Sequence, residues 1–206
     1  MNKLLVSTAY LPPIDYIKAM IDADKTEIEF HENFQKRSYR NRAVILSANG
    51  PLSLSIPVKR PNGNHTLISE VLIDYNEPWQ HDHWQAIQSA YNKSPYFEYY
   101  SYLFEPFYQK KWDTLLDYNT DLLKKILTIL SIPTPISFTK EYVANPPETS
   151  DCRDLFQKHK SGLSLYTIAS YNQVFDYKFP FVEKISILDT IFNLGPDTGS
   201  YLQGMK

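Results

Sequence analysis

The sequence predicts an α/β (or α+β) fold with a mixed sheet, and three observations lead to that class. A strand, a helix and a strand follow one another within residues 4–31, which is the order of a parallel βαβ unit. Short alternating segments over residues 43–74 predict antiparallel hairpins, and residues 79–130, a mainly helical middle, carry helical periodicity. The chain of 206 residues suits a single domain. We expect it to comprise a sheet-rich part (1–75), a helical part (76–132), and a closing strand, loop and C-terminal helix (133–206).

The composition is that of a globular protein with a core, because 43% of the residues are hydrophobic and 21% are charged. The formal net charge of -2 provides no overall field for holding nucleic acid or an anionic membrane. No apolar segment approaches the length of a membrane span, and the apolar run after Met1 is too short for a signal peptide. We therefore expect a soluble, cytoplasmic protein without membrane insertion.

Familiar catalytic and cofactor motifs are absent from the sequence. The six glycines form neither G-x-G-x-x-G nor a P-loop, and there is no G-x-S-x-G elbow and no H-E-x-x-H. Cys152 is the single cysteine, so an intrachain disulfide is impossible. Its acidic neighbours Asp151 and Asp154 should raise its pKa, which argues against a nucleophile. No cofactor and no metal ion are expected.

The N-terminal segments predict where a ligand would bind. The apolar run 4–9 before Pro12-Pro13 predicts a strand and a turn, residues 13–23 have helical spacing, and residues 27–31 alternate as in a second strand. Ligands of parallel sheets gather beyond the carboxyl ends of the strands. This rule places four residues near the rim of a pocket, namely Tyr10, Pro12, His31 and Glu32.

A cluster of cations occupies residues 36–42, which contain Lys36, Arg37, Arg40 and Arg42 in a nearly neutral chain. One interpretation is an anion site for phosphate or carboxylate, because the guanidinium fork matches those groups. The other is a solvated loop, which is the commoner origin of a charge run.

Hairpins are predicted next. Residues 43–48 and 52–58 flank Asn49-Gly50, a strong turn signal, and the second segment alternates apolar and polar side chains so that one face is buried. Pro57 places that strand near an edge. Residues 67–74 predict another strand, so these antiparallel pieces should make the sheet mixed.

The most distinctive helix is predicted for residues 79–91. One face of it carries Trp79, His83, Ala86, Ile87 and Ala90, with Tyr91 at the edge. Pro95 forbids continuation, and Ser94 is expected to cap the next helix. A lone histidine such as His83 on an apolar face is commonly a structural residue bonded to a carbonyl, and an acid or base is the alternative. His81 and His83 point to nearly opposite sides of the helix, which argues against a metal site.

The later elements follow from periodicity. Residues 96–108 predict a helix bent or broken at Pro106, residues 115–130 a long amphipathic helix, and residues 136–142 a late strand. The stretch 151–166 has no clear pattern.

A short C-terminal helix is predicted from Ser186 to Leu194. Ser186 and Asp189 fit a capping box, and Gly195-Pro196 fits a helix stop. Asp189 is therefore expected first of all as a cap, with a catalytic carboxylate as the lesser alternative.

Four motifs, in order, resemble those of the WbqC-like family. The central one, similar to W-x3-H-x3-I-x3-Y-x-K-x-P-Y-F, is Trp79…His83…Ile87…Tyr91…Lys93…Pro95-Tyr96-Phe97. Residues 10–16, 36–42 and 185–196 are similar to the family's Pro-rich opening, its Lys-Arg-x-Trp-x-Asn-Arg element and its closing L-S-I-L-D…N-x-G-P. The chain differs from the family at Thr8-Ala9, where Gln-Pro is frequent, at Phe30-His31, where a pair of Asp is frequent, and in a reduced segment 161–174.

The resemblance implies a role in surface polysaccharide biosynthesis of the O-antigen type, and that setting suggests a transferase acting on a nucleotide-linked amino sugar. For such an enzyme we expect His83 as acid or base and Asp189 as a second catalytic candidate. The residues expected to bind a small anionic substrate are Tyr10, Pro12, Arg40, Asn41, Arg42, Trp79, Tyr91 and Lys93.

Two other functions are compatible with the sequence. One is a non-catalytic binding or scaffold protein of the same pathway, with an aromatic interface around Tyr96, Tyr99, Tyr100 and Tyr102. Nucleic-acid binding through residues 36–42 is the weakest hypothesis, because the patch is local and the net charge is negative. Nothing in the sequence sets an oligomeric state.

Overall fold

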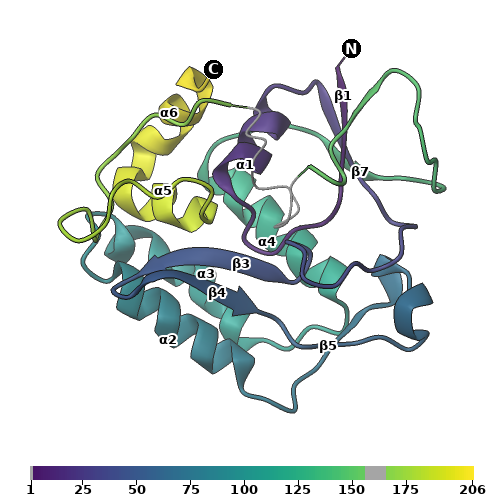
Figure 1. The fold of residues 1–206 in the computed structure, drawn as a ribbon, viewed down its shortest axis with the longest axis horizontal. Helices are drawn as coiled ribbons and strands as arrows, with labels where there is room; N and C mark the ends of the chain where they lie inside the picture. The colour runs from purple at the N-terminus through teal and green to yellow at the C-terminus, as the bar shows by residue number, and fades with distance from the viewer. Residues whose placement is uncertain (1, 156–165) are drawn as a thin grey trace.

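The computed structural model describes residues 2–155 and 166–206, and its largest sheet is parallel with the strand order β7-β2-β1-β8, on one side of the molecule (Figure 1). The strands are β1 (Lys3–Val6), β2 (Lys25–Ile28), β7 (Ile136–Phe138) and β8 (Thr149–Asp151). Helix α1 (Ile14–Ile21) joins β1 to β2, so the predicted βαβ unit is confirmed. The reduced segment 161–174 and the unpatterned stretch 151–166 each lie partly outside the described residues.

The antiparallel segments form separate two-stranded sheets and do not join the parallel one. The pairs are β3 (Arg42–Ser47) with β4 (Gly50–Ser55), and β5 (Val58–Lys59) with β6 (Leu72–Ile73). Ala48 and Asn49 make the first turn, and Gly50 then takes a φ of 100°, a conformation that glycine adopts without strain. The strand predicted over residues 67–74 is shorter, because a 3-10 helix (Ile68–Glu70) precedes β6.

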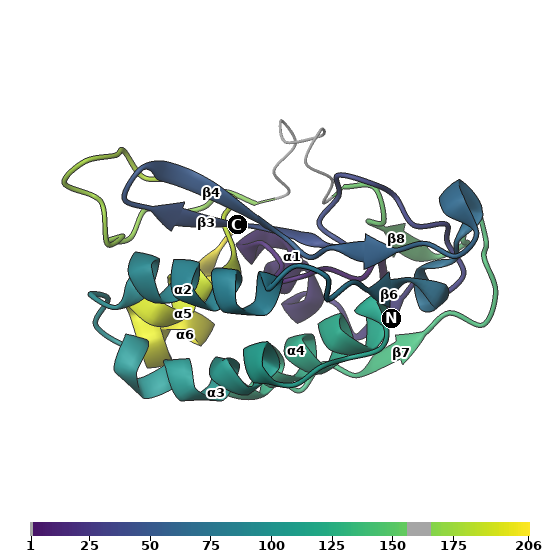
Figure 2. The ribbon, with the colours of Figure 1, turned by 90° about the horizontal axis from the view of Figure 1, so that it is seen from below.

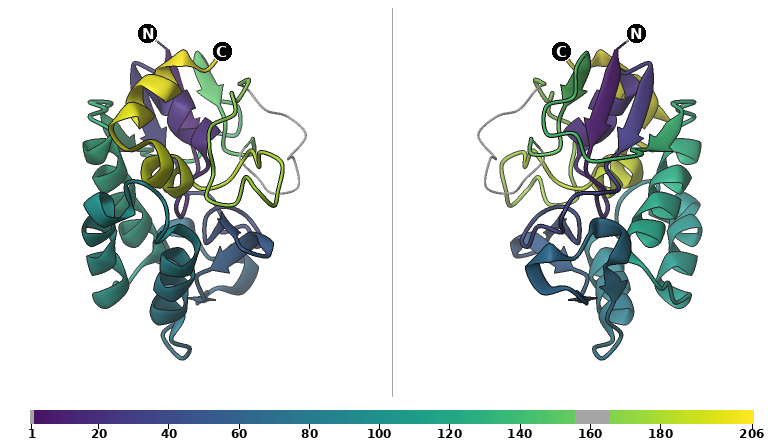
Figure 3. Two further views of the ribbon diagram at one scale, coloured as in Figure 1. Left: turned by 90° about the vertical axis from the view of Figure 1, so that its left-hand side faces the viewer. Right: turned by 90° about the vertical axis from the view of Figure 1, so that its right-hand side faces the viewer.

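Helices cover the sheets on several sides. They are α2 (Trp79–Tyr91), α3 (Phe97–Gln109), α4 (Leu115–Ile129), α5 (Ile187–Leu194) and α6 (Thr198–Gly204), with 3-10 turns at Gly63–His65 and Gly195–Asp197. Figure 2 shows α2, α3 and α4 together below the β3–β4 hairpin, and α2 contacts β3. In Figure 3 the C-terminal helices α5 and α6 lie beside α1, which both of them contact. The α/β class and the helical middle are as predicted.

The boundary between α2 and α3 differs from the prediction. Helix α3 begins at Phe97, and the Ser94 hydroxyl donates 2.6 Å to the Tyr91 carbonyl, so Ser94 closes α2 and does not cap α3. Pro106 lies within α3, which continues to Gln109. The proline removes a single helical N–H near the end of the helix, and the segment is not broken there.

The apolar face of α2 is in the core, as its spacing predicted. Trp79, Ile87 and Ala90 are buried, His83 is 7% exposed, and Ala86 is half-buried against the same cluster. Within the described residues no helix is long and apolar enough to cross a membrane.

The C-terminal helix has the predicted ends but not the full predicted cap. The Ser186 hydroxyl accepts a hydrogen bond from the Leu188 N–H, and α5 ends at Gly195 with a φ of 54°. The Asp189 side chain is not reaching back to the cap. It accepts hydrogen bonds from Tyr171 and Gln173 in the interior, so the expectation that Asp189 acts as a cap was wrong.

Candidate functional site

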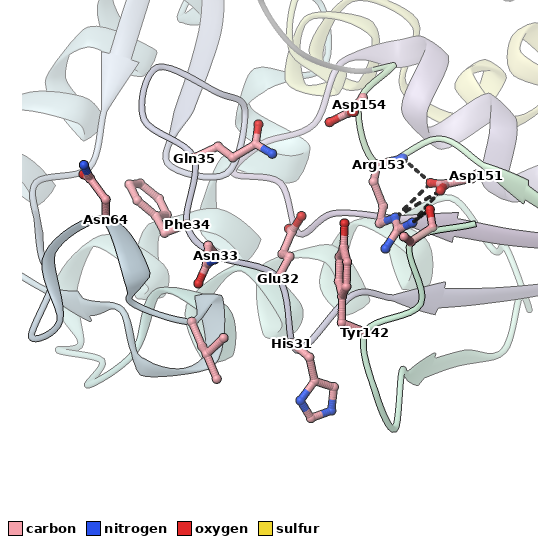
Figure 4. Close-up of a pocket in the computed structure, with 12 residues that line it drawn as sticks. His31, Glu32, Asn33, Phe34, Gln35, Asn64, Tyr142, Asp151, Arg153 and Asp154 are labelled. Carbon is pink, nitrogen blue, oxygen red and sulfur yellow. Dashed lines mark hydrogen bonds and ion pairs between the residues drawn. The ribbon is translucent and has the colours of Figure 1, made fainter. Parts of the chain in front are cut away.

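A cleft of about 660 Å³ lies beyond the carboxyl ends of β2 and β8. This is where ligands of parallel sheets are expected, and the volume is in the range of small-molecule sites. Its lining is mainly polar and aromatic: His31, Glu32, Asn33, Phe34, Gln35, Asn64, Leu67, Tyr142, Ala144, Asp151, Arg153 and Asp154 (Figure 4). His31 and Glu32 therefore line a pocket at the carboxyl edge, as predicted, whereas Tyr10 and Pro12, which were predicted beside them, do not line it. The His31 ring points away from the Glu32 carboxylate in Figure 4.

Glu32 is held by a buried ion pair at the base of the cleft. The Arg40 guanidinium donates from Nε to Glu32 Oε1 over 2.8 Å and from Nη2 to Oε2 over 2.5 Å. Ser7, just after β1, donates to Glu32 Oε2 and accepts from Arg40 Nη2. Arg40 and Glu32 are 2% and 5% exposed, so the carboxylate is fixed in position before any ligand arrives.

Arg153 organises the other side of the cleft, just after β8. Its Nη1 donates to Glu29 over 3.0 Å, and its Nε and Nη2 donate to Asp151, with the shortest distance 2.6 Å. Hydrogen bonds with Asp151 raise the pKa of Arg153. Burial alone would raise the pKa of Asp151, but the bonds from Arg153 outweigh it and hold that pKa below its usual value.

The cation cluster is divided between the interior and the surface. Arg40 is buried in the pair with Glu32, whereas Lys36 and Arg37 are exposed and immediately follow the cleft-lining Gln35. Within residues 2–155 and 166–206, neither Lys36 nor Arg37 has an ion-pair partner. These two residues are therefore exposed cations that directly follow the cleft lining in the chain.

Asn41 is buried just before β3, and the partly buried Arg42 begins that strand opposite Ser55 of β4. The Asn41 amide donates 2.8 Å to the Ile56 carbonyl, and its Oδ1 is buried without a partner among the described residues. The Nε of Arg42 is likewise buried and unpaired there. Neither residue lines the cleft.

His83 belongs to a buried hydroxyl and aromatic network. The Tyr10 hydroxyl lies 2.9 Å from His83 Nδ1 and 3.0 Å from the Tyr108 hydroxyl, and Trp79 packs edge-on against the imidazole at 5.2 Å between centroids. Burial lowers the pKa of His83 to about 4, against opposing effects of Asp82 and a hydrogen bond with the Ser55 backbone. The imidazole is therefore neutral at pH 7. Its proposed acid–base role stays a prediction.

Tyr91 and Asp189 meet at a different place, between α2 and α5, and the exposed Lys93 follows α2 in the chain. The Tyr91 hydroxyl is buried and interacts with Asp189, whose Oδ2 accepts from Tyr171 over 2.7 Å. Burial raises the pKa of Asp189, and the Tyr171 and Gln173 donors only partly offset it. Lys93 lines a neighbouring pocket of about 500 Å³.

The predicted site residues thus fall into separate groups. Tyr10, Trp79 and His83 share one buried network, and Tyr91, Lys93 and Asp189 share another region. Pro12 is buried and its carbonyl accepts from the Ile187 N–H, which ties the N-terminal turn to α5. Only Arg40, through Glu32, is connected to the sheet-edge cleft.

Sequence reasoning missed Arg153, Asp151 and Tyr142. Asp151 ends β8, Arg153 follows it and Tyr142 lies in the loop before it. The strand has three residues with the polar sequence Thr-Ser-Asp, which has no alternation to reveal it. The available signal was an arginine two residues after an aspartate, which is common on any surface.

Cofactor chemistry has little support from these side chains. In the part of the chain that the structure describes, no three His, Cys, Asp or Glu side chains are grouped to hold a metal ion. Burial, with a smaller effect of Asp151, raises the pKa of Cys152 to about 11, which disfavours the thiolate.

The structure is that of an α/β protein with a polar cleft at the carboxyl edge of a parallel sheet. The chain belongs to the WbqC-like protein family, whose family model matches residues 8–158. It is 27% identical over 223 aligned residues to "Uncharacterized protein Rv1507c" of Mycobacterium tuberculosis, a match that covers 97% of this chain and 96% of that protein. No solved structure matches the chain.

Proposed function

We propose that the chain binds a nucleotide-linked sugar in the sheet-edge cleft and acts as a transferase on it in surface polysaccharide biosynthesis of the O-antigen type. The pathway and the preference for an amino sugar come from the resemblance to WbqC-like proteins. The observation that carries the proposal is the composition of the cleft, in which a fixed carboxylate and several amides lie beside two exposed cations.

The polar lining suits the sugar part of such a ligand. The two oxygens of Glu32 have about four lone-pair sites, and Arg40 and Ser7 fill three of them. A hydroxyl or ammonium group can use the remaining site. Asn33, Gln35 and Asn64 add amide groups, which can both donate to and accept from sugar hydroxyls. Cleft residues that are already ordered lose little entropy on binding.

The exposed cations suit the anionic part of the ligand. Lys36 and Arg37 follow Gln35 directly, so a diphosphate leaving the cleft at that edge would meet two positive charges. Arg40 serves the sugar side indirectly, because it fixes Glu32. Of the cation cluster 36–42, the proposal therefore uses the two exposed residues, Lys36 and Arg37, as the anion site.

Thermal unfolding with a panel of nucleotide sugars tests the proposal. A ligand that binds only the folded state raises the melting temperature, and we expect the largest shift from amino-sugar nucleotides and a smaller one from the free nucleotides. The variant K36A/R37A should lose most of the shift, while the matched control K124A/K125A on α4 should keep it. A flat response of the wild-type protein across the panel would contradict the proposal.

A non-catalytic scaffold is the second candidate, and one observation favours it. Tyr99 and Tyr102 on α3 are 69% and 63% exposed, three residues apart on one helix, which gives an aromatic surface suited to a protein partner. In that case Y99S/Y102S should abolish capture of a pathway protein in a pull-down. H83A should leave the capture intact. Loss of sugar binding in Y99S/Y102S would count against a scaffold role.

A further inference from the structure

The loop between β7 and β8 carries an exposed aromatic residue over the sheet-edge cleft. Tyr142 is 55% exposed, lies in residues 139–148, and lines the cleft together with Glu32 and Arg153. We infer that Tyr142 is the platform on which a sugar ring stacks, and that Arg153 is the positioning residue that holds this platform in place. The inference rests on the proposed function for the identity of the ligand, and deepens it by naming the contact that selects a pyranose ring.

A single guanidinium fixes the loop to the sheet edge. Nη2 of Arg153 donates to the Val143 carbonyl over 2.9 Å and to the Ala144 carbonyl over 3.1 Å. The other donors of the same guanidinium are taken by Glu29 and Asp151 at the ends of β2 and β8. Since Arg153 is only 7% exposed, these bonds form in a poorly hydrated position and hold the backbone on both sides of the cleft edge.

The same guanidinium also orients the Tyr142 ring. The Arg153 Cζ lies 4.8 Å from the ring centroid, so one face of the ring is covered by the cation. Figure 4 draws the Tyr142 ring between Arg153 and Glu32, seen nearly edge-on. Arg153 thus supports one face of the Tyr142 ring. Because Tyr142 is 55% exposed, the rest of the ring is available to a ligand in the cleft.

The surroundings favour a sugar over a nucleobase as the stacked group. A pyranose has an apolar C–H face for the aromatic ring, and hydroxyl or amino groups around its edge for Glu32 and the cleft amides. A base would stack equally well on the ring. Guanine would also offer two donors to the carboxylate that lies in the same cleft, but the other bases have few. The combination of one aromatic face and one fixed carboxylate therefore matches a hexose, and most closely an amino hexose.

Titration with small probes tests the platform directly. The probes are methyl glycosides of glucosamine, glucose and a 6-deoxyhexose, with UMP, TMP and GMP as the base-bearing comparison. The Y142W variant provides an indole whose fluorescence reports stacking, and unsubstituted protein gives the background from the native Trp residues. We expect glycosides to quench the new signal, Y142F to keep the glycoside affinity measured by calorimetry, and Y142A to lose about tenfold.

The positioning role of Arg153 needs a measurement that a general loss of stability would leave unchanged. R153K keeps the charge and loses the planar fork. We expect faster hydrogen exchange confined to residues 140–146, a red shift of the indole emission in R153K/Y142W, and weaker glycoside binding. A uniform rise in exchange over the sheet, with unchanged emission, would show a merely structural role and overturn this half of the inference.

The outcomes separate the two proposals. If N33A/N64A, which removes two exposed amides of the cleft lining, weakens glycoside binding while Y142A leaves it unchanged, the cleft binds sugars and the platform is wrong. If Y142A weakens only the nucleotides, the ring stacks a base and the sugar assignment is overturned. If glycosides, nucleotides and nucleotide sugars all fail to bind the wild-type protein, the proposed function and the platform both fail.

Discussion

The Tyr10 hydroxyl lies 2.9 Å from Nδ1 of His83, an imidazole whose pKa is lowered to about 4 by burial. Tyr10 also approaches the Tyr108 hydroxyl at 3.0 Å, and both tyrosines are within the core. A hydrogen bond with the Ser55 backbone engages His83 from the hairpin. The hydrogen bond between Tyr10 and His83 therefore links the N-terminal turn to α2. Because the buried imidazole has a lowered pKa, the free energy of unfolding should depend on pH.

The stability of the protein should fall as the pH drops from about 6.5 towards 4, in part because of His83. Its pKa is lowered to about 4 in the folded state, so between these values the unfolded state binds the extra proton. The free energy of unfolding then decreases by up to about 1.4 kcal/mol per pH unit from this group. Urea unfolding at pH 7, 6 and 5 measures the slope, and H83Q should have a shallower one. Equal slopes for H83Q and the wild-type protein would refute the lowered pKa of His83.

Breaking the buried pair of Glu32 and Arg40 should destabilise the fold strongly. E32Q or R40M leaves a charge buried without its partner, which typically costs about 3–5 kcal/mol. The Arg40 and Glu32 side chains are 2% and 6% exposed, so little solvent screening is available. Urea unfolding should show this loss, whereas K59A, in an exposed pair with Asp74, should change the free energy of unfolding by less than about 1 kcal/mol. A loss as small as that of K59A would mean that solvent reaches the buried pair.

Replacing Gly195 should be far more damaging than replacing Gly63. Both have positive φ, 54° and 58°, so alanine is strained at either position. A Cβ at Gly195 would also overlap the Tyr96 ring, whereas nothing lies within 4 Å of one at Gly63. We expect G195A to lower the melting temperature by several degrees more than G63A. Similar values for the two variants would show that Tyr96 moves aside freely.

The thiol of Cys152 should react slowly in the folded protein. Its pKa is raised to about 11 by burial, so little thiolate exists at pH 8. Dithionitrobenzoate at that pH should modify it far more slowly in buffer than in 6 M guanidinium. Rapid modification of the native protein would contradict the buried position.

The helices were predictable because their signals are local and repeated. Trp79, Ile87 and Ala90 recur at helical spacing, and the structure buries that face of α2 as expected. The βαβ unit was predictable for the same reason. Ser94 was misassigned because its hydroxyl bonds backward to Tyr91, a choice that depends on how α3 approaches.

The cleft was predictable only in part. The carboxyl-edge rule located His31 and Glu32 without any coordinates. The ion pair of Arg40 was not predictable, because its partner Glu32 is eight residues away and the two meet only when the chain turns back between them. Arg153 joins the cleft through β8, a strand too short and too polar to be recognised by pattern.

The most direct test of the cleft is a hydrogen-exchange footprint of the nucleotide sugar that stabilises the protein most. We predict slower exchange in residues 29–37 and 140–154, which contribute the cleft lining, and no change in residues 91–96 and 187–194 around Lys93 and Asp189. Protection confined to the second pair of segments would contradict the account and move the ligand to the pocket between α2 and α5.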